Sequence, residues 1–314
     1  MAKYNLGNAL FVGFAVLIAS LNALQARVNG ELGFRTGDGF FSAMLSIGGG
    51  FVILSTAMLL SPKGRQGIRS LPAALRDKRL VWWQLLGGLS GAYYAIAQTT
   101  TGLVLGVALF SVALVSGQTL SSILMDRFGV GPSGMHPITW PRLLGTVLVL
   151  FAVTISVAGQ LEADFSVFIA VVPFLAGFAA GWQMAVNGRV KKESGSVLAA
   201  TFLNFSIAIT FLITFVLIKG LFTGWPTSLP QEPWLYTGGI LGAIFIAGSA
   251  FVVGRIGVLV LGVSVVAGQL VGAMIIDIIA PSPLHPLTSA TVLGVVLALV
   301  AVAITSIRTS RTPS

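Results

Sequence analysis

The sequence predicts an all-α integral membrane protein with ten transmembrane helices, arranged as two inverted five-helix repeats. Three observations lead to this class. The 314 residues are 55% hydrophobic and only 9% charged, whereas soluble domains carry about a quarter charged residues. The chain also contains ten long apolar runs, and its basic residues gather between alternate runs.

Each apolar run is long enough to cross a bilayer as a helix. A hydrocarbon core needs about 20 apolar residues in helical form, because backbone polar groups must find partners within the segment. The predicted spans cover roughly residues 6–26, 40–61, 81–101, 104–125, 141–160, 165–187, 197–219, 234–253, 257–279 and 287–307. Short links at Gly102 and at 254–257 predict two antiparallel hairpins, formed by the third and fourth spans and by the eighth and ninth.

The basic residues indicate the orientation of the chain. With the N-terminus inside, 15 of the 18 Lys and Arg residues face the cytoplasm, and only Arg27, Arg35 and Lys219 fall outside. Cytoplasmic loops collect Lys and Arg, so we expect both termini in the cytoplasm. The net charge of +9 is then a record of topology, and no nucleic-acid partner is predicted. The basic stretch 63–79 predicts an interfacial segment that is attracted to membrane lipids.

Four groups of residues recur in the same order in the two halves of the chain. The first-half groups are Gln25, Asn29 and Gly30; Trp83, Gly87, Gly88, Gly91 and Ala92; Gly117, Gln118 and Asp126; and His136, Pro137, Thr139 and Gly145. Their second-half matches are Gln183, Asn187 and Gly188; Trp234, Gly238, Gly239, Gly242 and Ala243; Gly268, Gln269 and Asp277; and His285, Pro286, Thr288 and Gly294.

This duplication predicts two repeats, residues 1–160 and 161–314. Because five is an odd number of spans, the second repeat enters the membrane from the opposite side. Inverted repeats of this kind expose a shared central site alternately to the two faces, which indicates a transporter of small-molecule solutes.

The same residues carry a resemblance to a known family. The stretch from Gln25 to Gly30, the glycines from Gly87 to Gly91, the stretch from Gly117 to Gly129 and the segment from Arg142 to Gly145 resemble the YdcZ-type branch of the drug/metabolite transporter superfamily. The resemblance covers nearly the whole chain. It implies a bacterial inner-membrane exporter, built here as a fused tandem of two five-helix units. It names no substrate, and a homodimer of the fused chain stays open.

Polar side chains inside the spans are the candidates for a substrate site. An amide buried in hydrocarbon costs about 2 kcal/mol or more without a partner, so Gln118 and Gln269, near the middle of their spans, call for a role. One hypothesis has both amides facing a central cavity; the other has them holding helices together.

The third span adds Tyr93, Tyr94 and Gln98, which predict selection of a solute with an aromatic or cationic part. Packing with a hydroxyl hydrogen bond is the alternative for the tyrosines. Gln25 and Gln183, a matched pair, complete the candidate substrate-binding set.

Two acids are candidates for gating or proton coupling. Asp126 and Asp277 lie at the ends of their spans, where an acid opposes the helix dipole and therefore calls for a cationic partner or proton chemistry. The alternative is an interfacial residue that caps a loop or pairs an arginine.

Other functional classes lack their working residues. The chain has no Cys, and the inverted topology places His136 and His285 on opposite faces about 30 Å apart, so no metal site and no cofactor are predicted. The spans hold no paired acids, no Ser–Lys pair and no histidine cluster, so we do not expect an enzyme. Two other functions stay open: a non-transporting membrane partner or scaffold protein, and a scrambler of lipid substrates.

Overall fold

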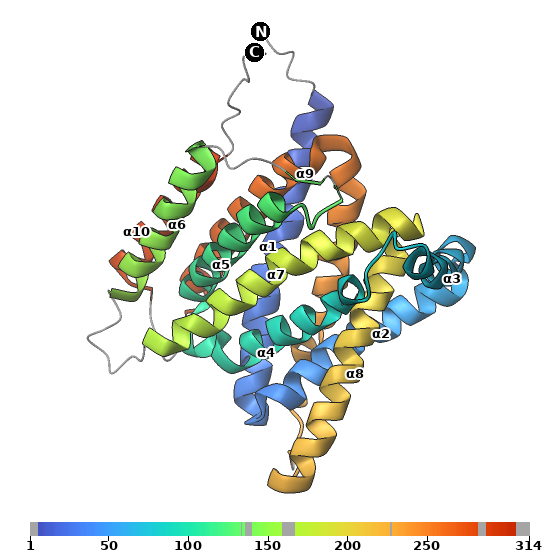
Figure 1. Cartoon of the computed structure of the whole chain (residues 1–314). Coiled ribbons are helices and arrows are strands. Elements are labelled where there is room, and N and C mark those ends of the chain that lie inside the picture. The colour runs from blue at the N-terminus through green and yellow to red at the C-terminus, as the bar shows by residue number, and fades with distance from the viewer. Residues whose placement is uncertain are drawn as a thin grey trace, which may run out of the picture.

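The computed structural model describes residues 6–132, 134–135, 140–158, 167–226, 228–281 and 287–305. Within these ranges the regular structure is helical, which confirms the predicted all-helical class. Figure 1 shows the long helices gathered in one bundle, with the short helix α3 at its edge. The elements are α1 (Leu6–Thr36), α2 (Gly39–Leu60), α3 (Pro62–Arg76), η1 (Trp82–Leu86), α4 (Gly87–Leu105), α5 (Val107–Phe128), α6 (Trp140–Ala158), α7 (Val167–Ser194), α8 (Val197–Thr223), η2 (Pro233–Tyr236), α9 (Gly238–Ile279) and α10 (Ser289–Thr305).

Five of the described helices are long and apolar enough to cross a membrane. They are Leu10–Thr36, Gly39–Leu60, Val107–Met125, Ile169–Ser194 and Val197–Thr223. Several of these helices carry large apolar side chains on outward faces: Leu17 is 65% exposed and Leu221 is 82% exposed. Such faces are expected where hydrocarbon replaces water as the solvent. The other five predicted spans and the orientation of the termini stay predictions.

Short polar side chains set several helix starts. Asp38 caps α2 by accepting hydrogen bonds from the backbone amides of Phe40 and Phe41 at 3.1 and 3.2 Å. Ser61 caps α3 through the amide of Gly64 at 3.0 Å, and Ser196 caps α8. Each side chain satisfies amides that the first helical turn leaves without a partner.

The link between α4 and α5 lies four residues later than predicted. The chain turns at Gly106, where φ is 73° and ψ is 156°, a conformation that is open essentially only to glycine. Gly102 is instead inside α4, and a Cβ on it would lie 3.1 Å from the Ala26 carbonyl oxygen of α1. Two glycines lie close together here, and the first serves helix packing while the second forms the turn.

Helix α9 folds back on itself although all 42 of its residues are helical. A straight helix of this length would extend about 63 Å. Its first half meets α1 in descending order, with Gly242 against Gln25 and Gly248 against Ile18, and its second half runs back along α1, with Gly268 against Val16. Figure 1 shows this reversal in the orange ribbon. The predicted antiparallel arrangement is present, but it forms without a non-helical link at 254–257.

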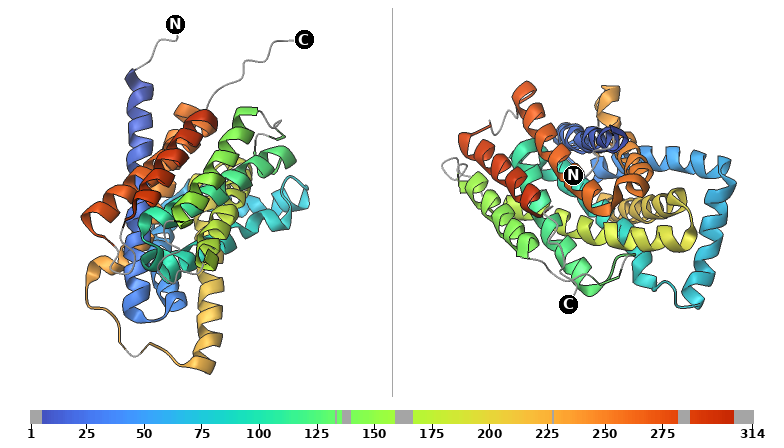
Figure 2. Two further views of the ribbon diagram at one scale, coloured as in Figure 1. Left: turned by 90° about the vertical axis from the view of Figure 1, so that its left-hand side faces the viewer. Right: turned by 90° about the horizontal axis from the view of Figure 1, so that it is seen from above.

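The helices of the two halves pack mainly against each other. Helix α1 packs on α9, α7 packs on α4 and α5, α2 packs on α8, and α6 packs on α10. Seen from above in Figure 2, α6 and α10 lie together at one edge of the bundle and α3 lies at the opposite edge.

Equivalent contacts recur in this packing. A Cβ on Gly88 would meet the carbonyl oxygen of Asn204, and a Cβ on Gly239 would meet the carbonyl oxygen of Ser46. Gly239 lies 151 positions after Gly88, and Asn204 lies 158 positions after Ser46. These two offsets match those of the duplicated motifs.

Candidate functional site

Two clusters of amide side chains lie against the glycine-rich starts of α4 and α9. The first amide cluster contains Gln25, Asn29, Ser46 and Gln98, beside Gly238, Gly239 and Gly242. The second amide cluster contains Gln183, Asn187 and Asn204, beside Gly87, Gly88 and Gly91. Because these glycines have no side chain, the amide side chains can lie directly against the helix backbones.

The distances show how closely the amide side chains approach these glycines. A Cβ on Gly238 would lie 2.0 Å from Asn29 Oδ1, and one on Gly87 would lie 2.7 Å from Asn187 Oδ1. Any residue other than glycine would therefore displace these polar side chains.

The first amide cluster is buried and only partly hydrogen-bonded. Asn29 Nδ2 donates to Gln98 Oε1 at 2.7 Å, and both side chains are fully buried. Asn29 Oδ1, Ser46 Oγ and Gln98 Nε2 have no hydrogen-bond partner in the described part of the chain. Each such group costs about 1–3 kcal/mol in a protein interior, so this cluster keeps donor and acceptor capacity that the fold does not use.

The second amide cluster forms a continuous chain of hydrogen bonds. Gln183 Nε2 donates to Asn204 Oδ1 at 2.9 Å, and Asn204 Nδ2 donates to Asn187 Oδ1 at 3.2 Å. Asn204 joins α8 to α7 through these two contacts. The matched clusters therefore differ in chemistry, because Ser46 is too short to make the bridge that Asn204 makes.

The two mid-span glutamines lie in different surroundings. Gln118 is half-buried on α5, and its amide Nε2 donates to the sulfur of Met184 on α7 at 3.1 Å. Gln269 is buried in the half of α9 that runs back along α1, and its Oε1 has no hydrogen-bond partner among the described residues. No contact between these two glutamines is present in the described interactions. Their predicted shared role in substrate binding stays a prediction.

The aromatic residues of α4 lie between the halves. Tyr93 donates its hydroxyl to the Val172 carbonyl oxygen of α7 at 3.3 Å. Tyr94 packs against the core that contains Phe110 and Leu109, and its hydroxyl lies near the Gln98 amide. Helix α4 thus presents Gln98 to α1 and Tyr93 to α7.

Asp277 caps the start of α5 from the end of α9. Its carboxylate accepts hydrogen bonds from the backbone amides of Val107 at 2.9 Å and Ala108 at 2.6 Å, and the side chain is 6% exposed. The positive end of the α5 dipole stabilises this acid, so the unfavourable dipole of its own helix is offset. Its role in gating stays a prediction. The side chain of the matched Asp126 lies outside the described residues, as do His136 and His285.

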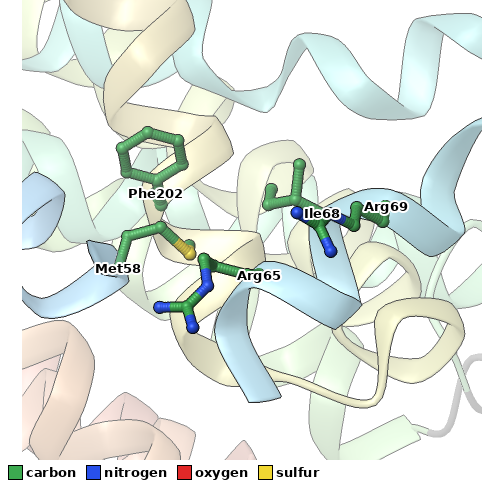
Figure 3. A pocket seen from close by; sticks show the side chains of 5 residues that line it. All are labelled: Met58, Arg65, Ile68, Arg69 and Phe202. Carbon is green, nitrogen blue, oxygen red and sulfur yellow. The ribbon is translucent and has the colours of Figure 1, made fainter. Parts of the chain in front are cut away.

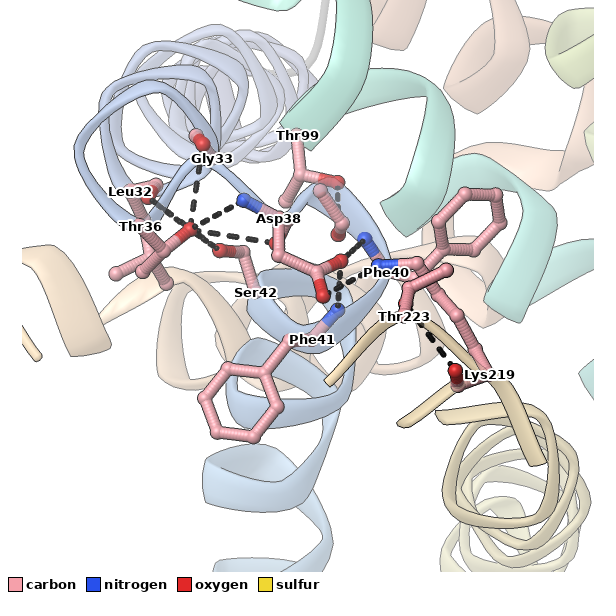
Figure 4. A network of polar contacts seen from close by, with 11 residues as sticks. Leu32, Gly33, Thr36, Asp38, Phe40, Phe41, Ser42, Thr99, Lys219 and Thr223 are labelled. Carbon is pink, nitrogen blue, oxygen red and sulfur yellow. Dashed lines mark hydrogen bonds and ion pairs between the residues drawn. The ribbon is translucent and has the colours of Figure 1, made fainter. Parts of the chain in front are cut away.

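A polar network that sequence reasoning missed closes the turn between α1 and α2. Thr36 Oγ1 and Ser42 Oγ lie 2.6 Å apart, and Thr99 of α4 donates to the Gly39 carbonyl oxygen at 2.7 Å (Figure 4). Lys219 of α8 pairs with Asp38 in the same place. The cap pattern at Asp38 was readable from the sequence, but the partners come from distant helices.

An ion-pair network lies at the C-terminal end of α1, next to this turn. Arg35 pairs with Glu31 at 2.8 Å and also with Glu232, just before η2. A hydrogen bond from its own backbone amide lowers the pKa of the Glu232 carboxyl most, and Arg35 lowers it further. This pairing ties the start of the second hairpin to the end of α1.

Comparison with known proteins identifies a family. Residues 10–155 and 168–304 match the model of a family described as "Putative inner membrane exporter, YdcZ", and the two segments fit a tandem repeat. A solved structure described only as "Crystal structure of protein" is similar over 96% of each chain, with a TM-score of 0.56 and 15% sequence identity. At that identity the likeness supports a shared fold alone. No curated protein matches the chain.

Proposed function

Because the chain belongs to the YdcZ family of the drug/metabolite transporter superfamily, we propose that it exports a small organic solute across the bacterial inner membrane. The family description supports a role in transport and a place in the inner membrane. The solute, the direction of flux and the mechanism are our inference. The chain acts as a carrier and not as an enzyme.

The observation that carries this proposal is the crossed packing of the two matched segments. Helix α1 of the first segment is clasped by the folded-back α9 of the second, and α7 of the second is clasped by α4 and α5 of the first. In an inverted pair of repeats, moving α1 relative to α9 opens one face of the membrane, and the equivalent movement of α7 opens the other. Two five-helix repeats, 1–160 and 161–314, with both termini in the cytoplasm, satisfy this scheme.

The first amide cluster is our candidate for binding the polar part of the solute. Its unused donors and acceptors on Asn29, Ser46 and Gln98 support this assignment, because buried polar groups are rarely left without a partner and these call for one. Tyr93 and Tyr94 supply aromatic surface on the same helix, which suits a solute with an aromatic or cationic part. Gln25, Gln118, Gln183 and Gln269 are further candidates along the same path.

Flux through a defined membrane tests the proposal. The purified chain is screened by thermal shift against metabolites and cationic drugs, and the solutes that stabilise it are then measured for flux in vesicles that contain no other protein. We expect saturable flux of at least one of these solutes. A non-transporting scaffold would give no flux, and a scrambler would move labelled lipid instead.

Glutamine variants test the site within the same assay. Gln98→Ala, Gln118→Ala and Gln269→Ala should each lower flux by about tenfold, because a lost hydrogen bond to a solute costs about 1.5 kcal/mol. Gln66→Ala is the matched control, since Gln66 is exposed on α3 outside the bundle. Unchanged flux in all three folded variants would remove the amides from the substrate path while leaving transport itself intact.

A further inference from the structure

Helix α3 is fixed on the bundle by small residues, although most of its charges face outward. A Cβ on Gly67 would lie 2.9 Å from Ala199 Cβ, and one on Gly64 would lie 3.0 Å from Met58 Sδ. Leu71 and Ala74 are buried on the same face. The helix therefore holds its arginines in a defined place rather than on a loose loop.

A shallow pocket of about 170 Å³ lies where α3 meets α2 and α8. Met58, Ile68 and Phe202 form its apolar lining, and Arg65 and Arg69 supply its only charges. Figure 3 shows Arg65 beside Met58 and Arg69 beside Ile68, with Phe202 beyond Met58. The pocket thus combines cationic groups with a hydrophobic surface.

The two arginines have no acidic partner in the described part of the chain. Arg65 donates to the Leu59 carbonyl oxygen at the end of α2, which positions its guanidinium and leaves other N–H groups unused. The nearby acids Asp77 and Glu193 pair instead with Arg79, at 3.2 and 2.7 Å. An anion at the pocket would therefore meet two unneutralised cations one helical turn apart.

The surroundings of the pocket place it at a membrane surface. Leu59 and Leu60, at the end of the apolar helix α2, are 73% and 78% exposed, and hydrocarbon is the solvent that such side chains require. Arg65 and Arg69 follow five and nine residues after Leu60, on α3. A ligand with a phosphate and a long apolar chain matches both the apolar and the cationic part of this region, whereas free phosphate matches only the arginines.

We propose that Arg65 and Arg69 bind the phosphate of one anionic phospholipid, whose acyl chain lies on Met58, Ile68 and Phe202. Guanidinium groups bind phosphate through charge-assisted hydrogen bonds, and clusters of basic residues beside a membrane helix bind anionic lipid. The site is independent of the solute path. It would hold the junction of α2, α3 and α8 at a fixed depth in the membrane.

Lipid retention by the full chain tests this site. The protein, purified in detergent, is incubated with phosphatidylglycerol or with phosphatidylcholine of identical acyl chains, and bound lipids are counted by native mass spectrometry. We expect one phosphatidylglycerol to be retained in preference to phosphatidylcholine. Arg69→Gln should lower this retention by about tenfold, whereas Arg76→Gln, about two turns further along α3 and outside the pocket, should change it by less than about twofold.

The variants distinguish lipid binding at a defined site from general attraction between basic residues and anionic lipid. Surface charge alone gives about fivefold per basic residue wherever the residue lies, so equal losses in Arg69→Gln and Arg76→Gln would overturn the proposal. The side chain of Arg69 makes no hydrogen bond to the described protein, so the Arg69→Gln variant should unfold at the parent temperature. Arg65→Lys, which keeps the charge and loses the fork of donors, should give an intermediate loss. If inorganic phosphate alone binds with the same dependence on Arg69 and the lipid does not, the lipid assignment is wrong.

Discussion

At the scale of single residues, glycine decides how closely the helices approach. Gly88 and Gly239 lie so near the carbonyl oxygens of Asn204 and Ser46 that a Cβ would stand 2.2 and 1.9 Å from them. Close approach through small residues is a main source of helix association in lipid, where the hydrophobic effect between helices is absent.

Alanine at these positions should therefore weaken the fold. Gly239→Ala should destabilise the protein by about 1–3 kcal/mol, because the backbone of α2 must move to admit the methyl group. Gly13→Ala is the control: Gly13 has open space around it, and alanine there should raise helix stability by about 1 kcal/mol. Thermal unfolding in detergent measures both, and a Gly239→Ala protein as stable as the parent would contradict the packing described here.

Asp277 should act as a cap in stability measurements. Asp277→Ala removes both acceptors for the Val107 and Ala108 amides and should cost about 1–2 kcal/mol. Asp277→Asn keeps one side-chain oxygen and should lose less. Equal unfolding midpoints for the parent and the alanine variant would show that the cap is unimportant, and the pH dependence of flux in the asparagine variant tests gating separately.

At the scale of elements, the ends of the helices are joined by charge pairs. Arg35 on α1 binds Glu232 beside η2, and Lys219 on α8 binds Asp38 at the start of α2. The Arg35–Glu232 pair is exposed, and exposed pairs contribute little individually, whereas the Lys219–Asp38 pair is partly buried. Both pairs nonetheless connect elements from both halves at one end of the bundle.

Glu232 predicts a small pH dependence of stability. Its pKa is lowered in the folded protein, so its stabilising effect is fully present above the unfolded value of about 4.3 and is lost as the pH falls through the folded value. The parent should exceed Glu232→Gln in unfolding temperature at pH 7, and the gap should close below about pH 4. A gap that widens on acidification would have the wrong sign and would exclude the pairing.

At the scale of the whole molecule, the two halves hold each other through α1 and α7. Transport by alternating access requires these contacts to shift during each cycle. A covalent link across one of them should therefore stop flux while leaving the fold intact.

A cysteine pair makes this test clean, because the chain has no cysteine of its own. A Cβ on Gly272 of α9 would lie 2.9 Å from Ser20 Cβ of α1, within about 1 Å of the spacing in a disulfide. Ser20→Cys with Gly272→Cys should cross-link under mild oxidation, lose flux, and recover it with reductant. Either single variant is the control, and full flux in the oxidised double variant would argue against movement between α1 and α9.

Composition and repeated motifs were enough to predict that the helices lie in hydrocarbon and that the chain is internally duplicated. Low charge and long apolar runs require helices, because a backbone in hydrocarbon must satisfy its own polar groups. The matched motifs indicated the tandem arrangement that the family match supports. These features are local or periodic, so they can be read without knowing which helices meet.

Tertiary structure decided which polar groups meet. Asn29 and Gln98 are 69 positions apart. Neither segment alone specifies that these two amides meet, or that the pair leaves some of its donors and acceptors unused. The reversal within α9 and the packing of Gly102 on α1 were also decided by tertiary contacts, because several glycines in each segment could have formed the turn. Pairing in space follows from the packing of whole helices, and that packing is a property of the complete chain.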